Sequence, residues 1–304
     1  MQQQTLARLA LLALLAGATG IGFAPILVRS SETGSTATAF HRVLFALPVL
    51  WMWMTLEQHQ PNAPQRPAEA GDYRALAIAG LFFAGDLAFW HWSIRWTSVA
   101  NATLLVNFAP IFVTLGAACF LSERISGSFV LALVLSLAGA AMLVGASWQL
   151  TPRRLAGDVL GLIAAVFYAG YQLSVKHLRG KFSAATVMSW SGLVSAPVLL
   201  LIAIGNGEKL LPNQAAGWLV LITLALVSHV GGQGLIAHAF GHLPASFSSL
   251  SLLLQPVVAA VLAWLFFGEG VSPLQATGGT VTLAGLYLAN RSRKSGAAHA
   301  IAGT

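Results

Sequence analysis

The sequence predicts an all-α membrane protein whose ten transmembrane helices form two inverted five-helix repeats around a central cavity. Three observations support this fold class. Of the 304 residues, 57% are apolar and only 8% are charged, against roughly 25% charged residues in soluble domains. Apolar stretches of about 20 residues, the length of one bilayer crossing, recur along the whole chain. A proline, a glutamate and a glycine recur at one spacing in the two halves.

This composition excludes several classes of protein. A soluble globular enzyme or a disordered chain carries more charged residues than this sequence does. The mean hydropathy of +0.75 is also too high for either class. Lys and Arg exceed Asp and Glu by seven, but they form no dense basic tract, so no nucleic-acid partner is expected. No phosphate-binding loop, Cys-x-x-Cys or His-Glu-x-x-His motif occurs. We therefore expect no enzyme activity, no cofactor and no metal site.

Ten apolar segments are each long enough for one span. The longest gap between them is polar and rich in proline, and no stretch outside the segments is long enough to bury a core of its own. The predicted spans are 8–28, 36–56, 74–95, 98–121, 127–148, 156–178, 184–205, 215–237, 244–267 and 272–290.

Loop charges predict the orientation of these spans. With the N-terminus inside, ten Lys and Arg residues lie on the inner side and five on the outer side, while Arg42 lies within the second span. Cytoplasmic loops carry the positive excess in membrane proteins. We therefore expect a multi-pass protein of the inner (plasma) membrane with both termini in the cytoplasm.

An internal repeat relates the two halves of the chain. At an offset of 146 residues the sequence matches Pro110 with Pro256, Glu123 with Glu269 and Gly139 with Gly285. Each half contains five spans, and because five is odd the second half starts on the opposite side of the membrane. Inverted repeats are a recurrent plan of secondary transporters. The predicted organisation is a first repeat at 1–150, a second repeat at 155–291 and a short cytoplasmic tail at 292–304.

The motifs within these repeats resemble a known family. They are Arg42 in the second span, the runs Arg95-Trp96-Thr97-Ser98 and Ser122-Glu123-Arg124, and their counterparts Leu254-Gln255-Pro256 and Gly268-Glu269. With them the chain resembles the EamA-type ten-helix transporters of the drug/metabolite transporter superfamily. The resemblance implies a secondary carrier whose cavity is lined by spans 1, 3, 4, 6, 8 and 9, with span 2 outside the lining. It also implies export of amino acids, other metabolites or drugs.

Asp86 is the strongest candidate for a substrate-binding residue. It is the only acidic residue deep inside a predicted span, and Phe83 and Trp90 share its helix face. A carboxylate among aromatic rings can bind an ammonium group, and it can also take up a proton during coupling. The alternative is a structural ion pair with Arg42 or a hydrogen bond to a neighbouring helix.

Arg42 has two interpretations. An arginine at this depth can hold a substrate carboxylate with two parallel hydrogen bonds. Because the resemblance places span 2 outside the cavity lining, the sequence favours an anchor between helices instead.

Further polar residues and two prolines complete the predicted site. Gln233 occupies the position of Asp86 in the second half, and His229 suits proton exchange, although hydrogen bonding between helices explains both equally well. The other substrate-binding candidates are Asn101, Asn107, Tyr168, Gln172 and Gln255. Pro110 and Pro256 are predicted hinges because proline frees a carbonyl and kinks a helix. Glu123 and Glu269 lie at helix ends and are predicted structural or gating residues.

The sequence thus predicts a secondary active transporter that works by alternating access. Export of small metabolites such as amino acids, aromatic or apolar, is the leading interpretation. An importer or exchanger of another small organic solute or drug is the alternative. The expected partners are a small-molecule substrate, the lipid bilayer and a coupling proton, and faces of small residues leave a monomer or a homodimer open.

Overall fold

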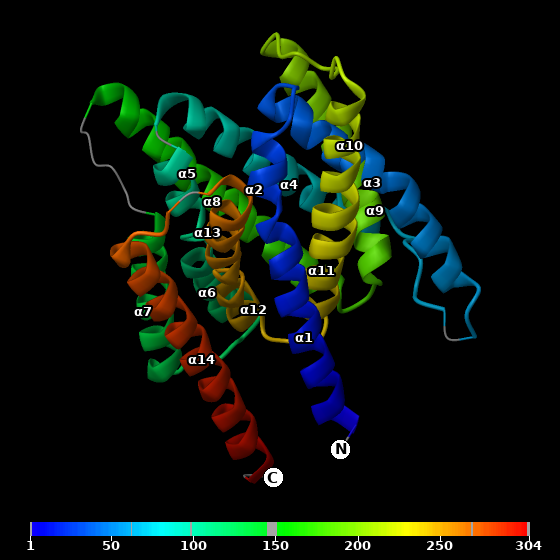
Figure 1. The fold of residues 1–304 in the computed structure, drawn as a ribbon. Coiled ribbons are helices and arrows are strands. Elements are labelled where there is room, and N and C mark those ends of the chain that lie inside the picture. The colour runs from blue at the N-terminus through cyan, green and yellow to red at the C-terminus, as the bar shows by residue number, and fades with distance from the viewer. Residues whose placement is uncertain (1, 62, 98, 145–150, 269, 303–304) are drawn as a thin grey trace.

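The computed structural model describes every residue except 1, 62, 98, 145–150, 269 and 303–304. Throughout this described part the regular structure is helical, and no strand occurs in it (Figure 1). The predicted all-α class is confirmed. The ends of the chain lie together at one end of the helix bundle, which is called the terminal end below (Figure 1).

The first half of the chain forms seven helical segments. They are α1 (Gln2–Gly22), α2 (Ala24–Arg29), α3 (Ser35–Gln58), α4 (Ala70–Trp96), α5 (Val99–Val106), α6 (Ala109–Phe120) and α7 (Gly127–Val144). The helices α1 and α2 make up span 1, and α5 and α6 make up span 4. The predicted end of span 5, beyond Val144, lies outside the described residues.

The second half forms eight helical segments. They are α8 (Pro152–Leu178), α9 (Ala184–Gly205), α10 (Ala215–Thr223), η1 (Leu224–Gln233), α11 (Gly234–Phe240), α12 (Ala245–Ser251), α13 (Leu254–Phe267) and α14 (Pro273–Ala302). Span 8 consists of α10, η1 and α11, and span 9 consists of α12 and α13. The segment η1 is a π-helix, a form that occurs mostly as short insertions at functional sites.

Nine of the ten predicted spans are long and apolar enough to cross a membrane within the described residues. The tenth, α14, forms a helix but is less apolar, because Thr280, Thr282 and several glycines interrupt its apolar residues. Gly278, Gly279 and Thr282 pack along α7, where Thr282 is fully buried, whereas Thr280 is exposed. Contact with protein therefore accounts for part of its weaker hydropathy.

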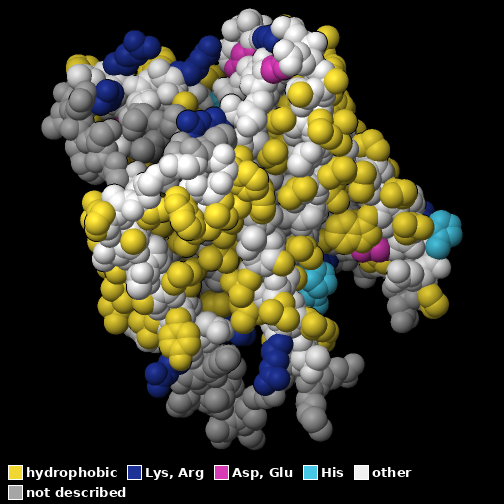
Figure 2. Space-filling model, in the orientation of Figure 1, with side chains coloured by type: hydrophobic (Ala, Val, Ile, Leu, Met, Phe, Trp, Pro, Cys, Tyr) yellow, Lys and Arg dark blue, Asp and Glu magenta, His cyan; other side chains and the backbone are white. Residues whose placement is uncertain are grey.

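Apolar side chains cover the middle of the molecular surface. In Figure 2 they spread over the helices, while Lys and Arg gather at the two ends. Leu12, Leu201 and Tyr287 are among the exposed large hydrophobic residues. An apolar surface of this extent marks contact with lipid rather than with water. The chain is a multi-pass membrane protein.

Helix packing follows a pattern that relates the two halves. The helix α4 of span 3 packs along α8 of span 6, and in the same way η1 and α11 of span 8 pack along α1 of span 1. The pairs α3 with α9 and α7 with α14 join spans 2 and 7 and spans 5 and 10. Each contact has a counterpart when the halves are exchanged. A duplicated chain would pack in this way, and its division at 150–155 stays a prediction.

Spans 4 and 9 are interrupted at corresponding positions. The break between α5 and α6 falls at Asn107 and Phe108, and the break between α12 and α13 falls at Leu252 and Leu253. Each break directly precedes the predicted hinge proline, Pro110 or Pro256, which lacks the N–H that would continue the helix.

The tightest packing between the halves joins α7 to α14 through two glycines. A Cβ atom added to Gly139 would lie 2.6 Å from the Gly278 carbonyl oxygen, and one added to Gly278 would lie 2.6 Å from the Gly139 carbonyl oxygen. Only glycine permits this approach of the two backbones. The helices meet at a face of small residues, which is how membrane helices come into close contact.

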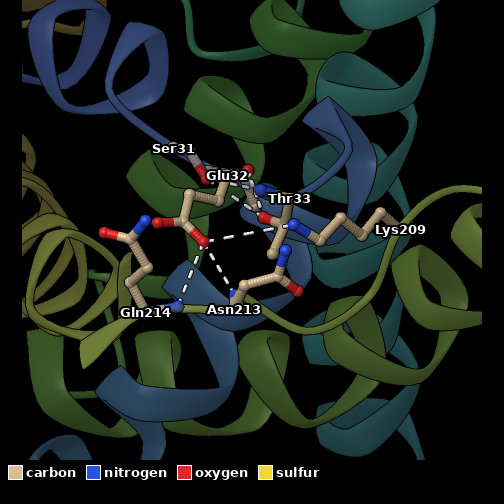
Figure 3. A network of polar contacts seen from close by, with 7 residues as sticks. Ser31, Glu32, Thr33, Lys209, Asn213 and Gln214 are labelled. Atoms are coloured by element: carbon tan, nitrogen blue, oxygen red, sulfur yellow. Dashed lines mark hydrogen bonds and ion pairs between the residues drawn. The ribbon is translucent and has the colours of Figure 1, made fainter. Parts of the chain in front are cut away.

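At the end opposite the termini, two glutamates join loops of different halves. Glu32 follows α2, and its Oε2 accepts hydrogen bonds from the backbone N–H groups of Asn213 and Gln214 at 2.7 and 3.3 Å. Figure 3 shows this carboxylate between those groups and Lys209, whose Nζ lies 4.0 Å away. Glu32 thus stabilises the start of α10, because a carboxylate satisfies helix N-terminal donors.

Glu208 makes the reciprocal contact. It precedes α10, and its two carboxylate oxygens accept hydrogen bonds at 2.9 Å from the Thr36 hydroxyl and the Ala37 backbone N–H in the first turn of α3. Each half therefore completes the start of a helix in the other half.

Removing the Glu208 carboxylate is expected to destabilise the protein through its contact with α3. Replacing Glu208 by alanine and Thr36 by valine, singly and together, should reveal a coupling energy of about 1.5–3 kcal/mol, because a hydrogen bond to a charged group contributes roughly that much. Thermal unfolding of the purified variants in detergent measures it. Additive effects of the two substitutions would contradict the assigned contact.

Candidate transport site

A cavity lies between the two halves near the middle of the spans. Its volume is about 170 Å³, room for on the order of ten water molecules or one small organic molecule. Its lining is Ile21, Gly22, Ala24, Pro25, Val28, Arg42, Phe83, Asp86, Leu87, Trp90, Thr103, Val106, Asn107, Tyr168, Gln233, Gln255, Pro256 and Ala259. These residues come from spans 1, 2, 3, 4, 6, 8 and 9.

The structure brings seven of the ten predicted substrate-binding residues together in this cavity. They are Phe83, Asp86, Trp90, Asn107, Tyr168, Gln233 and Gln255. The predicted hinge residue Pro256 also lines it, whereas Pro110 is buried in α6 outside the lining. Glu269 lies outside the described residues.

Three predicted residues do not line the cavity. His229 packs behind its wall, where its ring lies 5.5 Å from the ring of Phe83. Gln172 and Asn101 are buried in α8 and α5 and are not part of the lining. Each of the three is on a helix that contributes to the cavity.

Asp86 lies near the middle of α4 with one aromatic residue on either side. Phe83 stacks against Tyr171 with ring centroids 4.7 Å apart, and Trp90 follows Asp86 one turn later. The Asp86 side chain is buried, and within the described residues it makes no hydrogen bond and no ion pair within 4.0 Å. The carboxylate therefore faces the cavity with its hydrogen-bonding capacity unused.

Arg42 is the main residue whose position the sequence misjudged. The family resemblance placed span 2 outside the cavity and favoured an anchor between helices, but Arg42 of α3 lines the cavity. Its side chain is 9% exposed, and its Nε is buried without a hydrogen-bond partner. Asp86 acts on it electrostatically, yet the two form no ion pair within 4.0 Å. The structural ion pair that the sequence left open is not formed.

Two side-chain amides in the lining also have unused donors. Asn107 Nδ2 and Gln255 Nε2 are buried, and neither has a hydrogen-bond partner among the described residues. Asn107 lies at the break of span 4, and Gln255 lies in the first turn of α13, just after the break of span 9. Buried polar groups in folded proteins are nearly always satisfied, so such groups in a cavity indicate a bound molecule or water.

The family resemblance implied that span 1 lines the cavity, but the sequence analysis named none of its residues. The helices α1 and α2 contribute five residues to the lining, namely Ile21, Gly22, Ala24, Pro25 and Val28. A break at Phe23, directly before Ala24-Pro25, turns this span around the cavity. The Gly-Phe-Ala-Pro run was the signal in the sequence that marked this interruption.

Glu123 joins span 4 to span 9 at the terminal end of the bundle. Its Oε1 accepts a hydrogen bond from the Ala245 N–H at 2.5 Å. Its Oε2 accepts from the Ser246 N–H at 3.2 Å and from the Ser246 hydroxyl at 2.6 Å. These bonds tie the segment after α6 to the first turn of α12. We call this contact the Glu123 latch.

Basic residues close the same end from span 6. Lys176 donates hydrogen bonds to the carbonyls of Phe240 and Leu243 at 3.0 and 2.8 Å, and Arg179 donates to the Ala237 carbonyl at 3.0 Å. These cations satisfy carbonyls at the C-terminal end of α11. Burial lowers the pKa of His242 in the following loop, and the nearby Arg179 charge lowers this pKa further.

The helical fold, the lipid-facing surface and the cavity between the halves define a multi-pass small-molecule transporter rather than an enzyme. The sequence profile of the EamA-like transporter family matches residues 8–145 and 155–291. The chain belongs to the EamA-like transporter family.

Several named transporters are similar to this chain. A probable terminal-alkyne amino-acid exporter of Streptantibioticus cattleyicolor is 31% identical over 238 residues, 76% of this chain and 77% of that protein. The pseudopaline exporter CntI of Pseudomonas aeruginosa is 26% identical over 219 residues, 72% of this chain and 75% of its own. A solved crystal structure with 18% identity has a TM-score of 0.76 and covers 96% of this chain and 98% of that one. This last similarity shows the fold.

Proposed function

We propose that this protein is a secondary active exporter of amino acids or amino-acid-like metabolites across the inner membrane. The observation that carries the proposal is the cavity between the halves, where the unpaired Asp86 carboxylate lies between Phe83 and Trp90. A carboxylate in an aromatic setting attracts an ammonium group by charge and by contact with the rings. The names of two related exporters, which refer to an amino acid and to pseudopaline, support the direction of transport.

The proposed cycle is alternating access around this cavity. The breaks before Pro110 and Pro256 allow spans 4 and 9 to bend at corresponding points. The Glu123 latch closes the terminal end, which the loop charges assign to the cytoplasm. Transport would open this latch while the opposite end closes. The substrate-contacting residues in this proposal are Phe83, Asp86, Trp90, Asn107, Tyr168, Gln233 and Gln255.

Asp86 also provides a place for a coupling proton. Among the residues that the structure describes, it is the only acidic one in the cavity lining. A carboxyl group that exchanges a proton with a substrate can couple export to the proton gradient. Substrate and proton would then compete for one carboxylate.

Flux through proteoliposomes tests the proposed function. We expect purified protein to move at least one apolar or aromatic amino acid, and we expect Asp86→Asn to reduce this flux by about tenfold or more because a charged hydrogen bond is lost. The matched control is Asp158→Asn, because Asp158 lies in α8 outside the cavity lining. An Asp86→Asn variant that is folded and transports with unchanged rate and pH dependence would refute the role of Asp86. Failure of the wild-type protein to move any amino acid would refute the proposed substrate class.

A further inference from the structure

We propose that Arg42 and Asp86 act as the two poles of one binding site for a zwitterion, with Arg42 holding the carboxylate and Asp86 the ammonium group of an α-amino acid. This inference rests on the proposed function and assigns the substrate class that the cavity selects. It also makes Arg42 a specificity-determining residue of a span that the family resemblance placed outside the lining.

The position of Arg42 supports the first pole. The residue belongs to α3, which packs against α9 on one side, and its side chain reaches the cavity lining. It is nine-tenths buried, and its Nε has no partner within the described residues. A guanidinium presents its donors in a planar fork that matches the two oxygens of a carboxylate. A buried arginine with an unused donor thus requires an acceptor that the protein itself does not supply.

Asp86 supports the second pole. Its side chain is 7% exposed, lines the same cavity and makes no hydrogen bond to the described residues. A buried charge without a partner is costly, and here two opposite charges remain unpaired in one cavity. If their mutual attraction were their purpose, a direct ion pair would form. The two side chains line one cavity and form no ion pair within 4.0 Å, so the space that they share is the cavity itself.

An α-amino acid fits that space chemically. Its carboxylate and ammonium are attached to one carbon, so it can bind both poles at once, with charged hydrogen bonds of about 2.7–2.9 Å at each end. A bridging molecule of this kind keeps the two side chains beyond direct ion-pair distance. A dicarboxylate would bring a like charge to Asp86, and a diamine would bring one to Arg42. The arrangement therefore selects against both classes.

The remaining lining selects the substrate side chain. Ile21, Val28, Leu87 and Val106 form apolar walls, and Trp90 adds an aromatic one. An apolar or aromatic side chain would bury surface there, which is favourable at roughly 25 cal/mol per Å². The unused amides of Asn107 and Gln255 can donate further hydrogen bonds to the substrate carboxylate.

Three probes that differ in one charge test the inference. They are L-phenylalanine, phenethylamine, which lacks the carboxylate, and 3-phenylpropionate, which lacks the ammonium group. Binding to the protein in lipid nanodiscs is measured by calorimetry. For the wild type we expect L-phenylalanine to bind about tenfold to a hundredfold more tightly than either analogue, because each analogue leaves one buried charge unsatisfied.

Charge-neutralising variants assign each pole. In Arg42→Gln we expect the preference for L-phenylalanine over phenethylamine to fall to within about threefold, while the preference over 3-phenylpropionate is kept. In Asp86→Asn we expect the preference for L-phenylalanine over 3-phenylpropionate to fall to within about threefold, while the preference over phenethylamine is kept. Arg42→Lys should restore part of the lost preference, since it keeps the charge but not the planar fork.

The outcomes separate the inference from the proposed function. Two results would overturn the zwitterion site. One is a folded variant in which the affinities for all three probes fall equally. The other is an Arg42→Gln variant in which the ratios of these affinities are unchanged. If either of these results is seen while the wild type transports amino acids, the proposed function stands without the zwitterion site. If neither L-phenylalanine nor any other α-amino acid binds or moves, both are overturned. Size-exclusion profiles and melting temperatures establish that each variant is folded.

Discussion

Exchanging Glu123 for glutamine is expected to open the Glu123 latch and to shift the protein toward the state in which the terminal end is accessible. The two carboxylate oxygens accept three hydrogen bonds from Ala245 and Ser246. Glutamine keeps one oxygen but turns an amide N–H₂ toward a backbone N–H, so attraction becomes repulsion. Bonds to a charged group contribute about 1.5–3 kcal/mol each. A loss of one such bond changes the ratio of two states by about tenfold to a hundredfold.

Thiol labelling measures this shift. The chain contains one cysteine, Cys119, so a Cys119→Ala background with Thr103→Cys places a single thiol in the cavity lining. We expect Glu123→Gln to raise the labelling rate from the terminal side and to reduce flux. Ser246→Ala, which removes only the hydroxyl donor, should produce a smaller change in the same direction. Equal labelling rates in Glu123→Gln and the parent, with both folded, would refute a gating role for Glu123.

Replacing Gly139 with valine is expected to prevent α7 and α14 from packing, and it should have the largest effect on stability of any substitution considered. A Cβ at this position meets the Gly278 carbonyl at 2.6 Å, and that oxygen also accepts a hydrogen bond from Thr282. The obstacle is backbone rather than a flexible side chain, so the helices must separate. Overpacked sites cost typically about 1–3 kcal/mol, and a displaced helix pair lies at or above the upper limit.

The matched control lies on the same helix. A Cβ at Gly127, at the start of α7, meets no atom within 4 Å, so Gly127→Val should be close to neutral. The yield of monodisperse protein after size exclusion and its melting temperature in detergent compare the two variants. We expect Gly139→Val to give little folded protein and Gly127→Val a normal amount. A melting temperature of Gly139→Val within about 2 °C of the parent would contradict the close approach of the two helices.

The helices were predictable because membrane insertion requires a composition that can be seen locally. Nine spans meet that requirement by length and hydropathy alone. The π-helical segment η1 was not foreseen, since hydropathy and span length do not distinguish a π-helix from an α-helix. The lower hydropathy of α14 is explained in part by its packing against α7, a contact that a hydropathy profile does not show.

The site was predictable in part for the same reason. Polar residues are costly at bilayer depth, so Asp86, Gln233 and Gln255 were recognisable as candidates from position alone. What the sequence could not supply was the rotation of each helix about its axis. His229 and Gln233 lie on one helix segment, yet only Gln233 reaches the cavity, while His229 packs behind Phe83.

Arg42 shows a second limit of prediction from the sequence. Whether a buried charge pairs with a neighbour or remains unpaired depends on a few ångströms between helices that are far apart in sequence. The sequence offered both interpretations of Arg42, and the family pattern favoured the wrong side of the lining. The same holds for Glu123, whose position at a helix end was visible but whose partners, Ala245 and Ser246, are more than a hundred residues away.

The crossed contacts of Glu32 and Glu208 have a consequence for how the protein is made. Glu208 is synthesised 171 residues after Ala37, whose N–H it accepts. When the first five spans have left the ribosome, the first turn of α3 still lacks its carboxylate, and Glu32 still lacks the helix start that it will stabilise. The first half therefore waits in the bilayer in an unfinished form. Both contacts can form only after the loop at 206–214 has been synthesised.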